Sequence, residues 1–327
     1  MAVLGIESSA HTMGIGIVDD GKVLCNVKRM YKITNKGLIP ARVADFHSEG
    51  VGELLAEALE AAKIGIDDIE AVGYTAGPGL GACLRVGKVA ALTLSKRLGV
   101  PIMPVNHAVA HIEIAKWHLK MKNPLALYVS GGNSQIIGMI DKPNRHYHIY
   151  GETFDVGVGN MIDSFARYAK LNPAWGSTVA KVAEGGRYIE MPYTVKGMEF
   201  AFSGLLTNAQ KLIDAGRSAK DVAYSLQETA FSMLCEASER AMMLMGSKEV
   251  LICGGVAQSG RLKEMASIMC KSHGAKFGVA PDEYNADNGA MIALVAEKMF
   301  RSGQKVKDDD ITVKQKYRID SVKVNWR

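Results

Sequence analysis

Hydrophobic positions along the chain follow two spacings, and their order occurs twice. Short runs rich in β-branched residues are typical of strands, and longer segments with apolar residues every three to four positions are typical of helices. In the first half, three strands precede three helices, with a strand before each of the last two helices. The expected elements are strands 2–7, 14–18, 22–27, 70–75 and 101–105 and helices 41–63, 84–98 and 107–120.

The second half repeats this order with extra helical material. Two strand-like segments, at 311–314 and 321–324 in the charged tail from Val306, fall outside this repeated order. The expected elements are strands 125–130, 134–140, 146–150, 250–253 and 275–279 and helices 160–171, 221–245, 260–272 and 288–301.

Alternating strands and helices predict an α/β fold in which helices cover the sheets. The duplicated βββαβαβα order predicts two lobes with a central cleft, a natural place for a ligand. We expect the first lobe at 1–122, with the segment from about 290 to 327 returning to it. The second lobe is expected at 123–289, with a helical insertion at about 159–245.

Composition limits the classes of protein to consider. Of the 327 residues, 48% are hydrophobic and 22% are charged, which is a globular balance. Five scattered cysteines without CxxC spacing argue against a disulfide framework or a cysteine zinc site and favour a reducing compartment. No leader pattern and no apolar run of membrane-spanning length is found, so a cytoplasmic protein is expected. The net charge of +5 permits an anionic partner without requiring one.

Two histidines four positions apart are the first candidate for chemistry. His107 and His111 begin a predicted helix, so both imidazoles project from one face and can reach one ion. Asp287, beside another helix start, offers a carboxylate, and Tyr128 stands at a strand end. Two imidazoles and one carboxylate would leave coordination positions open, as in catalytic zinc or iron sites. The other interpretation is a histidine pair that simply packs at the start of the helix.

A zinc protease is poorly supported by the same segment. The HExxH pattern of such enzymes places a glutamate directly after the first histidine. Here Ala108 follows His107, and the nearest acid, Glu113, lies beyond the second histidine.

Three glycine-bearing loops follow predicted strands. Glycine allows backbone N–H groups to approach a phosphate or a ribose closely, although one such loop alone is more often a tight turn. Three of them at comparable places favour a nucleotide site, and none is a P-loop. The loops are "GYTAGPGLGACLRVG" (73–87), "LYVSGGNSQ" (127–135) and "LICGGVAQSGRL" (251–262).

Two further acids are candidates. Glu7 ends the first strand, where an acid faces the cleft in two-lobed phosphotransferase-like folds, or it serves as a capping or solvated acid. Asp163 lies in a helical pattern, where it either meets a ribose hydroxyl or pairs with Arg167 four residues later.

The chain resembles the tRNA N6-adenosine threonylcarbamoyltransferase family, and more narrowly the archaeal and eukaryotic catalytic subunit of the KEOPS complex, formerly called an O-sialoglycoprotein endopeptidase. The resemblance covers nearly the whole chain. It rests on "GIESSAHTMGIGIV", "GPGLGACLRVG", "PVNHAVAHIEIAKW", "LYVSGGNSQ", "GETFDVGVGNMIDSFARY", "MPYTVKGMEFAFSGLLT", "SLQETAFSML", "GGVAQSGRL" and "DNGAMIA".

The resemblance implies an actin/hsp70/sugar-kinase-like fold and a metal-dependent acyltransferase. The enzyme would move the threonylcarbamoyl group from threonylcarbamoyl-AMP to N6 of the adenosine beside the anticodon, in tRNAs reading codons that begin with A. It implies Fe²⁺ or Zn²⁺ as the metal and tRNA as a partner, with a small protein kinase, a dimerising subunit and a small regulatory subunit. By matching position, the metal ligands would be His107, His111 and Asp287, with Tyr128 as a possible fourth. The adenylate site would comprise Tyr128, Val129, Ser130, Gly131, Gly132, Asn133, Asp163, Gly176, Ala180 and Ser259.

Two positions depart from the family pattern. Ala180 stands where the family has a glutamate, and Ser259 stands where it has an asparagine. Both changes remove hydrogen-bonding groups from the expected nucleotide pocket, at about 0.5–1.5 kcal/mol for each lost contact. Glu7 is the one candidate for the proton acceptor. Competing interpretations are an ATP-binding regulatory scaffold of the same fold, a sugar kinase and, with least support, a metalloprotease.

Overall fold

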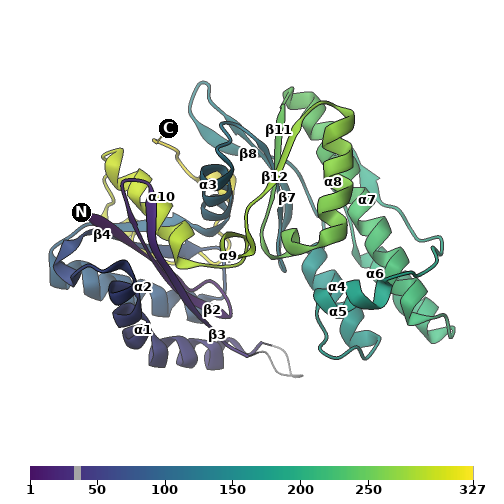
Figure 1. The fold of residues 1–327 in the computed structure, drawn as a ribbon, viewed down its shortest axis with the longest axis horizontal. Helices are drawn as coiled ribbons and strands as arrows, with labels where there is room; N and C mark the ends of the chain where they lie inside the picture. Colours follow the sequence, from purple (N-terminus) through teal and green to yellow (C-terminus); the bar gives the residue numbers. More distant parts are fainter. Residues whose placement is uncertain (33–37, 327) are drawn as a thin grey trace. The chain divides into compact units, whose positions relative to one another are not determined.

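The computed structural model describes residues 1–32 and 38–326, which form two compact units. The first unit comprises residues 1–117, 141–147 and 286–327, and the second comprises 118–140 and 148–285. Each unit is built on a five-stranded sheet (Figure 1). The strand orders are β3-β2-β1-β4-β5 and β8-β7-β6-β11-β12, which is the same connectivity used twice. The predicted duplication is therefore confirmed.

The sheet of the first unit combines a meander with parallel strands. The three N-terminal strands pair antiparallel, and β4 and β5 add to β1 in parallel. Asp20 and Gly21 both have positive φ (47° and 70°) in the β2–β3 turn, the conformation that a two-residue hairpin favours. The strands are β1 (Ala2–Glu7), β2 (Thr12–Asp19), β3 (Lys22–Met30), β4 (Ile69–Gly77) and β5 (Ile102–Asn106).

Helix α10 packs closely on β1 and β2 because glycines line that face. A Cβ atom on Gly5 would lie 2.1 Å from the Ala293 nitrogen, and one on Gly16 would lie 2.2 Å from the Ala290 nitrogen. The glycines thus admit the helix that follows Asp287. The helices of this unit are α1 (Pro40–Ala62), α2 (Gly81–Leu98), α3 (His107–Leu119, which enters the second unit after Trp117) and α10 (Gly289–Arg301).

The second unit repeats the sheet and adds helices. Its core is formed by the sheet and the long helix α7, whose buried side chains include Leu226, Phe231 and Leu234. The strands are β6 (Leu125–Val129), β7 (Ser134–Ile140), β8 (His146–Glu152), β11 (Glu249–Cys253) and β12 (Lys276–Val279), with a separate pair β9 (Val195–Lys196) and β10 (Glu199–Phe200). The helices are α4 (Val158–Tyr168), α5 (Gly176–Ala183), α6 (Ser203–Asp214), α7 (Ala219–Met245), α8 (Gly260–Ser272) and α9 (Asp282–Asn285).

The C-terminal tail differs from its prediction. Neither strand-like segment, at 311–314 or at 321–324, belongs to a strand in the described structure, and the tail instead contains single 3₁₀ turns at Asp308–Asp310 and Ile319–Ser321. Its backbone contacts the end of β4 without becoming a strand of the sheet, since the Lys314 amide donates to the Ala76 carbonyl at 2.7 Å. Apolar anchors such as Ile319 and Trp326 are buried.

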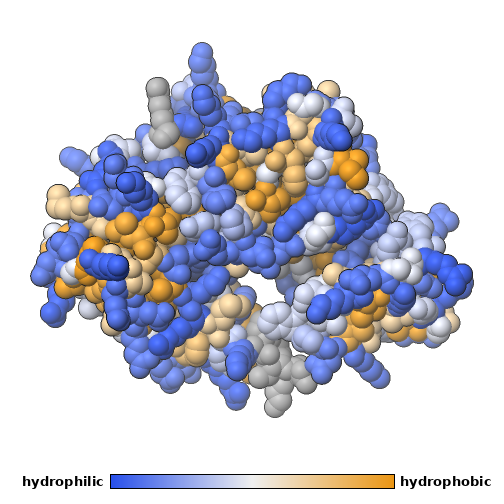
Figure 2. Space-filling model, in the orientation of Figure 1, coloured by the Kyte–Doolittle hydropathy of each residue, from blue (hydrophilic) through white to orange (hydrophobic). Residues whose placement is uncertain are grey.

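The face drawn in Figure 2 is predominantly hydrophilic, and hydrophobic residues gather on it only in separate patches. Among the described helices, none combines the length and apolar character needed to cross a bilayer.

Candidate functional site

Helix α3 begins at the residue that carries the first candidate ligand. The Oδ1 atom of Asn106, the last residue of β5, accepts a hydrogen bond from the Val109 amide at 3.1 Å. This side-chain cap satisfies one of the amides that a helix start leaves unpaired. His107 and His111 follow on one face of the helix, and their Nε2 atoms lie 3.2 Å apart.

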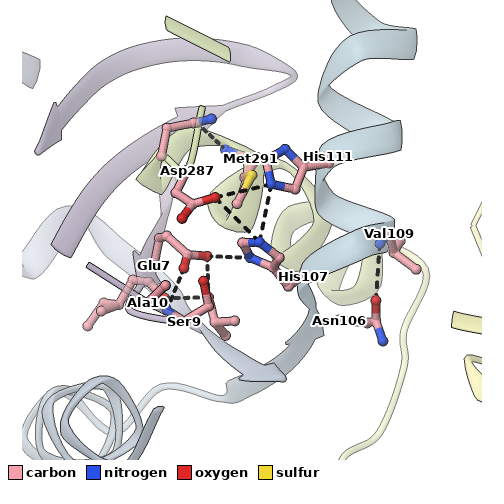
Figure 3. A network of polar contacts seen from close by, with 12 residues as sticks. Glu7, Ser9, Ala10, Asn106, His107, Val109, His111, Asp287 and Met291 are labelled. Carbon is pink, nitrogen blue, oxygen red and sulfur yellow. Dashed lines mark hydrogen bonds and ion pairs between the residues drawn. The ribbon is translucent and has the colours of Figure 1, made fainter. Parts of the chain in front are cut away.

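Asp287 joins the two histidines from the other end of the chain. It precedes Asn288, whose side chain caps α10 by accepting from the Met291 amide at 3.0 Å. One carboxylate oxygen, Oδ1, lies 3.5 Å from Nε2 of His107 and 3.3 Å from Nε2 of His111. Figure 3 shows the three side chains converging. Asp287 belongs to the first unit, as both histidines do, and not to the second lobe where the sequence-based boundary had placed it.

The spacing of these three atoms fits a metal ion. Their separations are 3.2, 3.3 and 3.5 Å. An ideal tetrahedron with metal–ligand distances of about 2.0–2.1 Å has edges of about 3.3–3.4 Å, so one ion can reach all three atoms. Two imidazoles and one carboxylate would leave positions open for a substrate. Among the described residues, these three form the one such cluster that could hold a metal.

The electrostatics of the group also suit a cation. Burial lowers the pKa of His111, so its imidazole is neutral near pH 7. Burial acts to raise the pKa of Asp287, but hydrogen bonds from the two histidines bring it well below its ordinary value. A neutral imidazole and an ionised carboxylate are the forms that bind metal.

Glu7 lies behind His107 rather than in the group itself. Its Oε2 accepts from His107 Nδ1 at 3.0 Å and from the Thr75 hydroxyl at 2.7 Å, while Oε1 accepts from the Ser9 amide at 2.6 Å. Burial acts to raise the pKa of this fully buried carboxyl, but the charge and hydrogen bond of His107 lower it below its ordinary value. With both oxygens bound, Glu7 has the geometry of an orienting residue rather than of a proton acceptor.

The predicted adenylate residues all lie in the second unit. Tyr128 is the residue before the last of β6, its side chain is only 1% exposed, and its ring lies against Gly254. The Ser130–Asn133 turn closes on itself, since the Ser130 amide donates to the Asn133 carbonyl at 2.8 Å. The first amides of α4 bond to this turn, with Asn160 donating to the Gly131 carbonyl at 3.0 Å. Gly131 and Gly132 are themselves exposed.

The structure brings Asp163 and Gly176 together directly. The Asp163 carboxylate faces the start of α5, where a Cβ atom on Gly176 would lie 4.0 Å from its Oδ1, and burial raises the pKa of this carboxyl although the Gly176 amide acts to lower it. Ala180 follows Gly176 by one turn on the same helix. Arg167 bonds to the Ser164 hydroxyl at 2.8 Å. Asp163 thus lies beside the start of α5, a position that neither sequence interpretation foresaw.

Ser259 also serves a helix start. Its hydroxyl accepts from the Leu262 amide at 3.4 Å and caps α8. Serine is among the residues preferred at this position, so the departure from asparagine keeps the cap.

The first glycine loop contacts the chain's own tail. A Cβ atom on Gly77 would lie 1.9 Å from the Lys314 carbonyl oxygen, and one on Gly81 would lie 2.2 Å from Nε2 of Gln315. These glycines therefore make room for protein backbone and side chain, and the 73–87 loop does not support the nucleotide-cradling role predicted for it.

Sequence reasoning missed Asn106, although a signal was present. Asparagine three residues before Val109, at a strand-to-helix junction, has the spacing of a helix cap.

Comparison with known proteins shows extensive sequence similarity. The family pattern described as tRNA N6-adenosine threonylcarbamoyltransferase matches residues 22–294. A protein of that name from Thermococcus sibiricus is 44% identical over the full length of both chains. A "probable bifunctional tRNA threonylcarbamoyladenosine biosynthesis protein" from Methanocaldococcus jannaschii is 45% identical over all of this chain and 60% of its own length.

Solved structures of low sequence identity share the fold. HypF from T. kodakarensis matches with a TM-score of 0.63 at 15% identity, over 95% of this chain and 49% of that one. A ROK family glucokinase from Streptomyces griseus matches with a TM-score of 0.52 at 14% identity, over 91% of this chain and 99% of that one. The predicted actin/hsp70/sugar-kinase-like fold is confirmed. By the extent of its sequence match, the chain belongs to the tRNA N6-adenosine threonylcarbamoyltransferase family.

Proposed function

We propose that this chain transfers the threonylcarbamoyl group from threonylcarbamoyl-AMP to N6 of the adenosine beside the anticodon, in tRNAs reading codons that begin with A. The observation that carries the proposal is the group of His107, His111 and Asp287, spaced for one cation, in a chain 44% identical to a full-length relative with this name. The reaction class is acyl transfer between an adenylate and an amine.

In the reaction, the adenosine N6 attacks the carbamoyl carbon. A C–N bond forms, the bond from that carbon to the phosphate oxygen breaks, AMP leaves and the amine loses one proton. A divalent ion held by the group would supply Lewis acidity and would orient the threonyl or carbamoyl oxygens. Glu7 holds the His107 ring with Nε2 directed at the group. A neutral His111 and an ionised Asp287 complete the set of donor atoms.

Residues of the second unit would bind the adenylate. The exposed glycines of the Ser130–Asn133 turn can present backbone N–H groups to a phosphate or to a developing oxyanion. Asp163, Gly176, Ala180 and Ser259 would line the nucleoside end, with Tyr128 as a possible fourth metal ligand. The position of Asp163 beside the start of α5 would place the carboxylate and the first amide of this helix at one end of the nucleoside.

The proposed setting is a cytoplasmic KEOPS complex. The partners would be tRNA, a small protein kinase, a dimerising subunit and a small regulatory subunit. Some relatives named bifunctional are longer than this chain, which spans 60–62% of two of them. Their length supports a further activity beside this one in those proteins.

A reconstituted assay tests the proposal. The chain, with the partner subunits, is incubated with threonylcarbamoyl-AMP and a tRNA transcript, and modified adenosine is measured by mass spectrometry after digestion. His107→Ala, His111→Ala and Asp287→Ala should each abolish transfer. His118→Ala removes an imidazole from the same helix outside the group and should not.

An ATP-binding scaffold of the same fold is the second candidate, and structural neighbours determined with bound nucleotide analogues favour it. Transfer that persists in a metal-free preparation and in His107→Ala would reject the role proposed for the ion. Those results would favour the scaffold.

A further inference from the structure

A segment of the C-terminal tail, Thr312–Tyr317, lies along the end of β4 and the loop that follows it. We refer to this segment as the strap. The Thr312 carbonyl accepts from the Tyr74 hydroxyl at 3.1 Å. The Lys314 amide donates to the Ala76 carbonyl at 2.7 Å, and the Gln315 carbonyl accepts from the Gly79 amide at 3.3 Å. Three polar contacts therefore attach the strap to one short stretch of the first unit.

The connection from the end of β4 to the start of α2 has space for the strap. Gly77 has φ of 144°, which side chains rarely adopt, and the Lys314 carbonyl oxygen occupies the position beside it where a Cβ would be. Gly81, the first residue of α2, leaves space for the Gln315 side chain in the same way. Because the fit is close, we regard the strap as an integral part of the first unit.

The end of the strap reaches the helix that carries the metal group. Nδ2 of Asn106 donates to the Tyr317 carbonyl at 3.0 Å, and Oδ1 of the same side chain accepts from the Val109 amide at 3.1 Å. Asn106 is 2% exposed, so neither bond competes much with water. One buried amide thus joins the strap to the first turn of α3, directly beside His107.

We propose that Asn106 is a positioning residue for the metal group and that the strap acts through it. The cap bond from the Val109 amide fixes where α3 begins and holds Oδ1 of the Asn106 side chain. The bond to Tyr317 holds Nδ2 as well, so both ends of the amide are held by backbone from separate segments. The orientation of the first turn then sets where the Nε2 atoms of His107 and His111 point.

The proposal rests on the proposed binding of a metal by His107, His111 and Asp287. It adds Asn106 and the strap, which would not bind the metal themselves. The simpler possibility is that Asn106 only caps α3. A variant that keeps the cap bond from Val109 but loses the bond to Tyr317, which we call the bridge, distinguishes the two possibilities. Asn106→Ser does this without a change of charge, because a serine hydroxyl can accept from the Val109 amide but is too short to reach Tyr317.

A second variant acts from the far side of the bridge. Lys314→Pro removes the N–H that donates to Ala76 and leaves Asn106 intact. Ile17→Val is the matched control, since it weakens the buried core of the same unit without touching the strap. Circular dichroism verifies that each variant is folded.

The measurement is the affinity of the metal-free protein for Zn²⁺, by competition with a chelating dye, together with the visible spectrum of the Co²⁺ derivative. Asn106→Ser and Lys314→Pro should each weaken Zn²⁺ binding by about tenfold, within the range known for outer-shell partners, and should alter the Co²⁺ bands. The double variant should resemble either single variant, because both break one connection. Ile17→Val should bind like the wild type.

Wild-type affinity and an unchanged Co²⁺ spectrum in Asn106→Ser would overturn the proposal while leaving the proposed function in place. If Asn106→Ser does not fold, the same result in Lys314→Pro has the same meaning. Failure of the wild-type protein to bind Zn²⁺ or Co²⁺ would overturn both this proposal and the metal-dependent part of the proposed function.

Discussion

Nδ1 of His107 donates a hydrogen bond of 3.0 Å to Oε2 of Glu7, a carboxylate that is fully buried. The ionised carboxylate can only accept, so Nδ1 of the imidazole carries a proton. Nε2 is the ring nitrogen that faces His111 and Asp287, and a cation bound there would take the place of any proton on it. A carboxylate behind a histidine is a common arrangement in metal sites, where it fixes the ring and increases its basicity.

Replacing this carboxylate by an amide should weaken metal binding. In Glu7→Gln, the side-chain NH₂ cannot accept from Nδ1, and rotating the amide to offer its oxygen costs the bond to the Ser9 amide. We expect a 10–100-fold loss of Zn²⁺ affinity, measured by chelator competition. Thr75→Val is the control, because it removes another donor to Glu7 but keeps the bond to His107. Equal losses in the two variants would contradict the orienting role.

The carboxyl group of Glu113 should make a pH-dependent contribution to the free energy of unfolding. This buried carboxylate pairs with Lys116 at 2.9 Å and also with Lys298 and Tyr147. Burial acts to raise its pKa, but the two lysines and the hydrogen bonds lower it from 4.5 to about 2. Such a group stabilises the fold above pH 4.5, and the stabilisation is lost as the pH falls towards 2.

The variant Glu113→Gln should therefore melt at a lower temperature than the wild type at pH 7, with a difference in unfolding free energy of about 3 kcal/mol. The difference should shrink as the pH is lowered below 4.5. Melting curves of both proteins across that range test this, with the exposed Glu57→Gln as the control. A gap between the curves that stays constant to low pH would rule out this linkage.

Asp155 stabilises the start of α6, a helix that was not among those predicted from the sequence. Its carboxylate accepts from the amides of Phe202 at 3.0 Å and Ser203 at 2.9 Å, so it caps α6 from a distant segment. Asp155→Ala should destabilise the protein by about 1–2 kcal/mol in a denaturant titration, and Asp155→Asn by less. Equal effects of the two variants would argue against the cap as the cause.

The departures at Ala180 and Ser259 predict weak nucleotide binding. Restoring both family residues, in Ala180→Glu with Ser259→Asn, should raise adenylate affinity by about 1–3 kcal/mol in calorimetry. Ala180→Gln tests whether charge matters, since a carboxylate one turn from Gly176 would lie near Asp163. Unchanged affinity in the restored protein would show that neither position contacts the nucleotide.

Much of the fold could be predicted because periodicity is local. The spacing of apolar residues indicates the type of strand β1 and of helix α3 within a few residues, and the repeated order of elements predicts two similar halves. Helix α5 was missed because its eight residues, GSTVAKVA, are rich in small and β-branched side chains. The prediction of a strand at 311–314 was wrong because a strand needs a free sheet edge, and β4, to which Lys314 bonds, already pairs with β1 and β5.

In the candidate site, too, the local features could be predicted and the long-range contacts could not. The spacing of His107 and His111 is a local property, and the family resemblance supplied Asp287. The bridge from Asn106 to Tyr317 joins residues 211 positions apart, and no pattern within either segment indicates it. Likewise, the glycines at 77 and 81 look the same in sequence whether they approach a phosphate or a backbone carbonyl.

The most direct test of the metal group is the metal content of the purified protein. Wild type and His111→Ala are prepared side by side with Zn²⁺ or Fe²⁺, and bound metal is measured by elemental mass spectrometry. We expect one ion per wild-type chain and close to none in His111→Ala. Equal metal content in the two proteins, or none in the wild type, would contradict it.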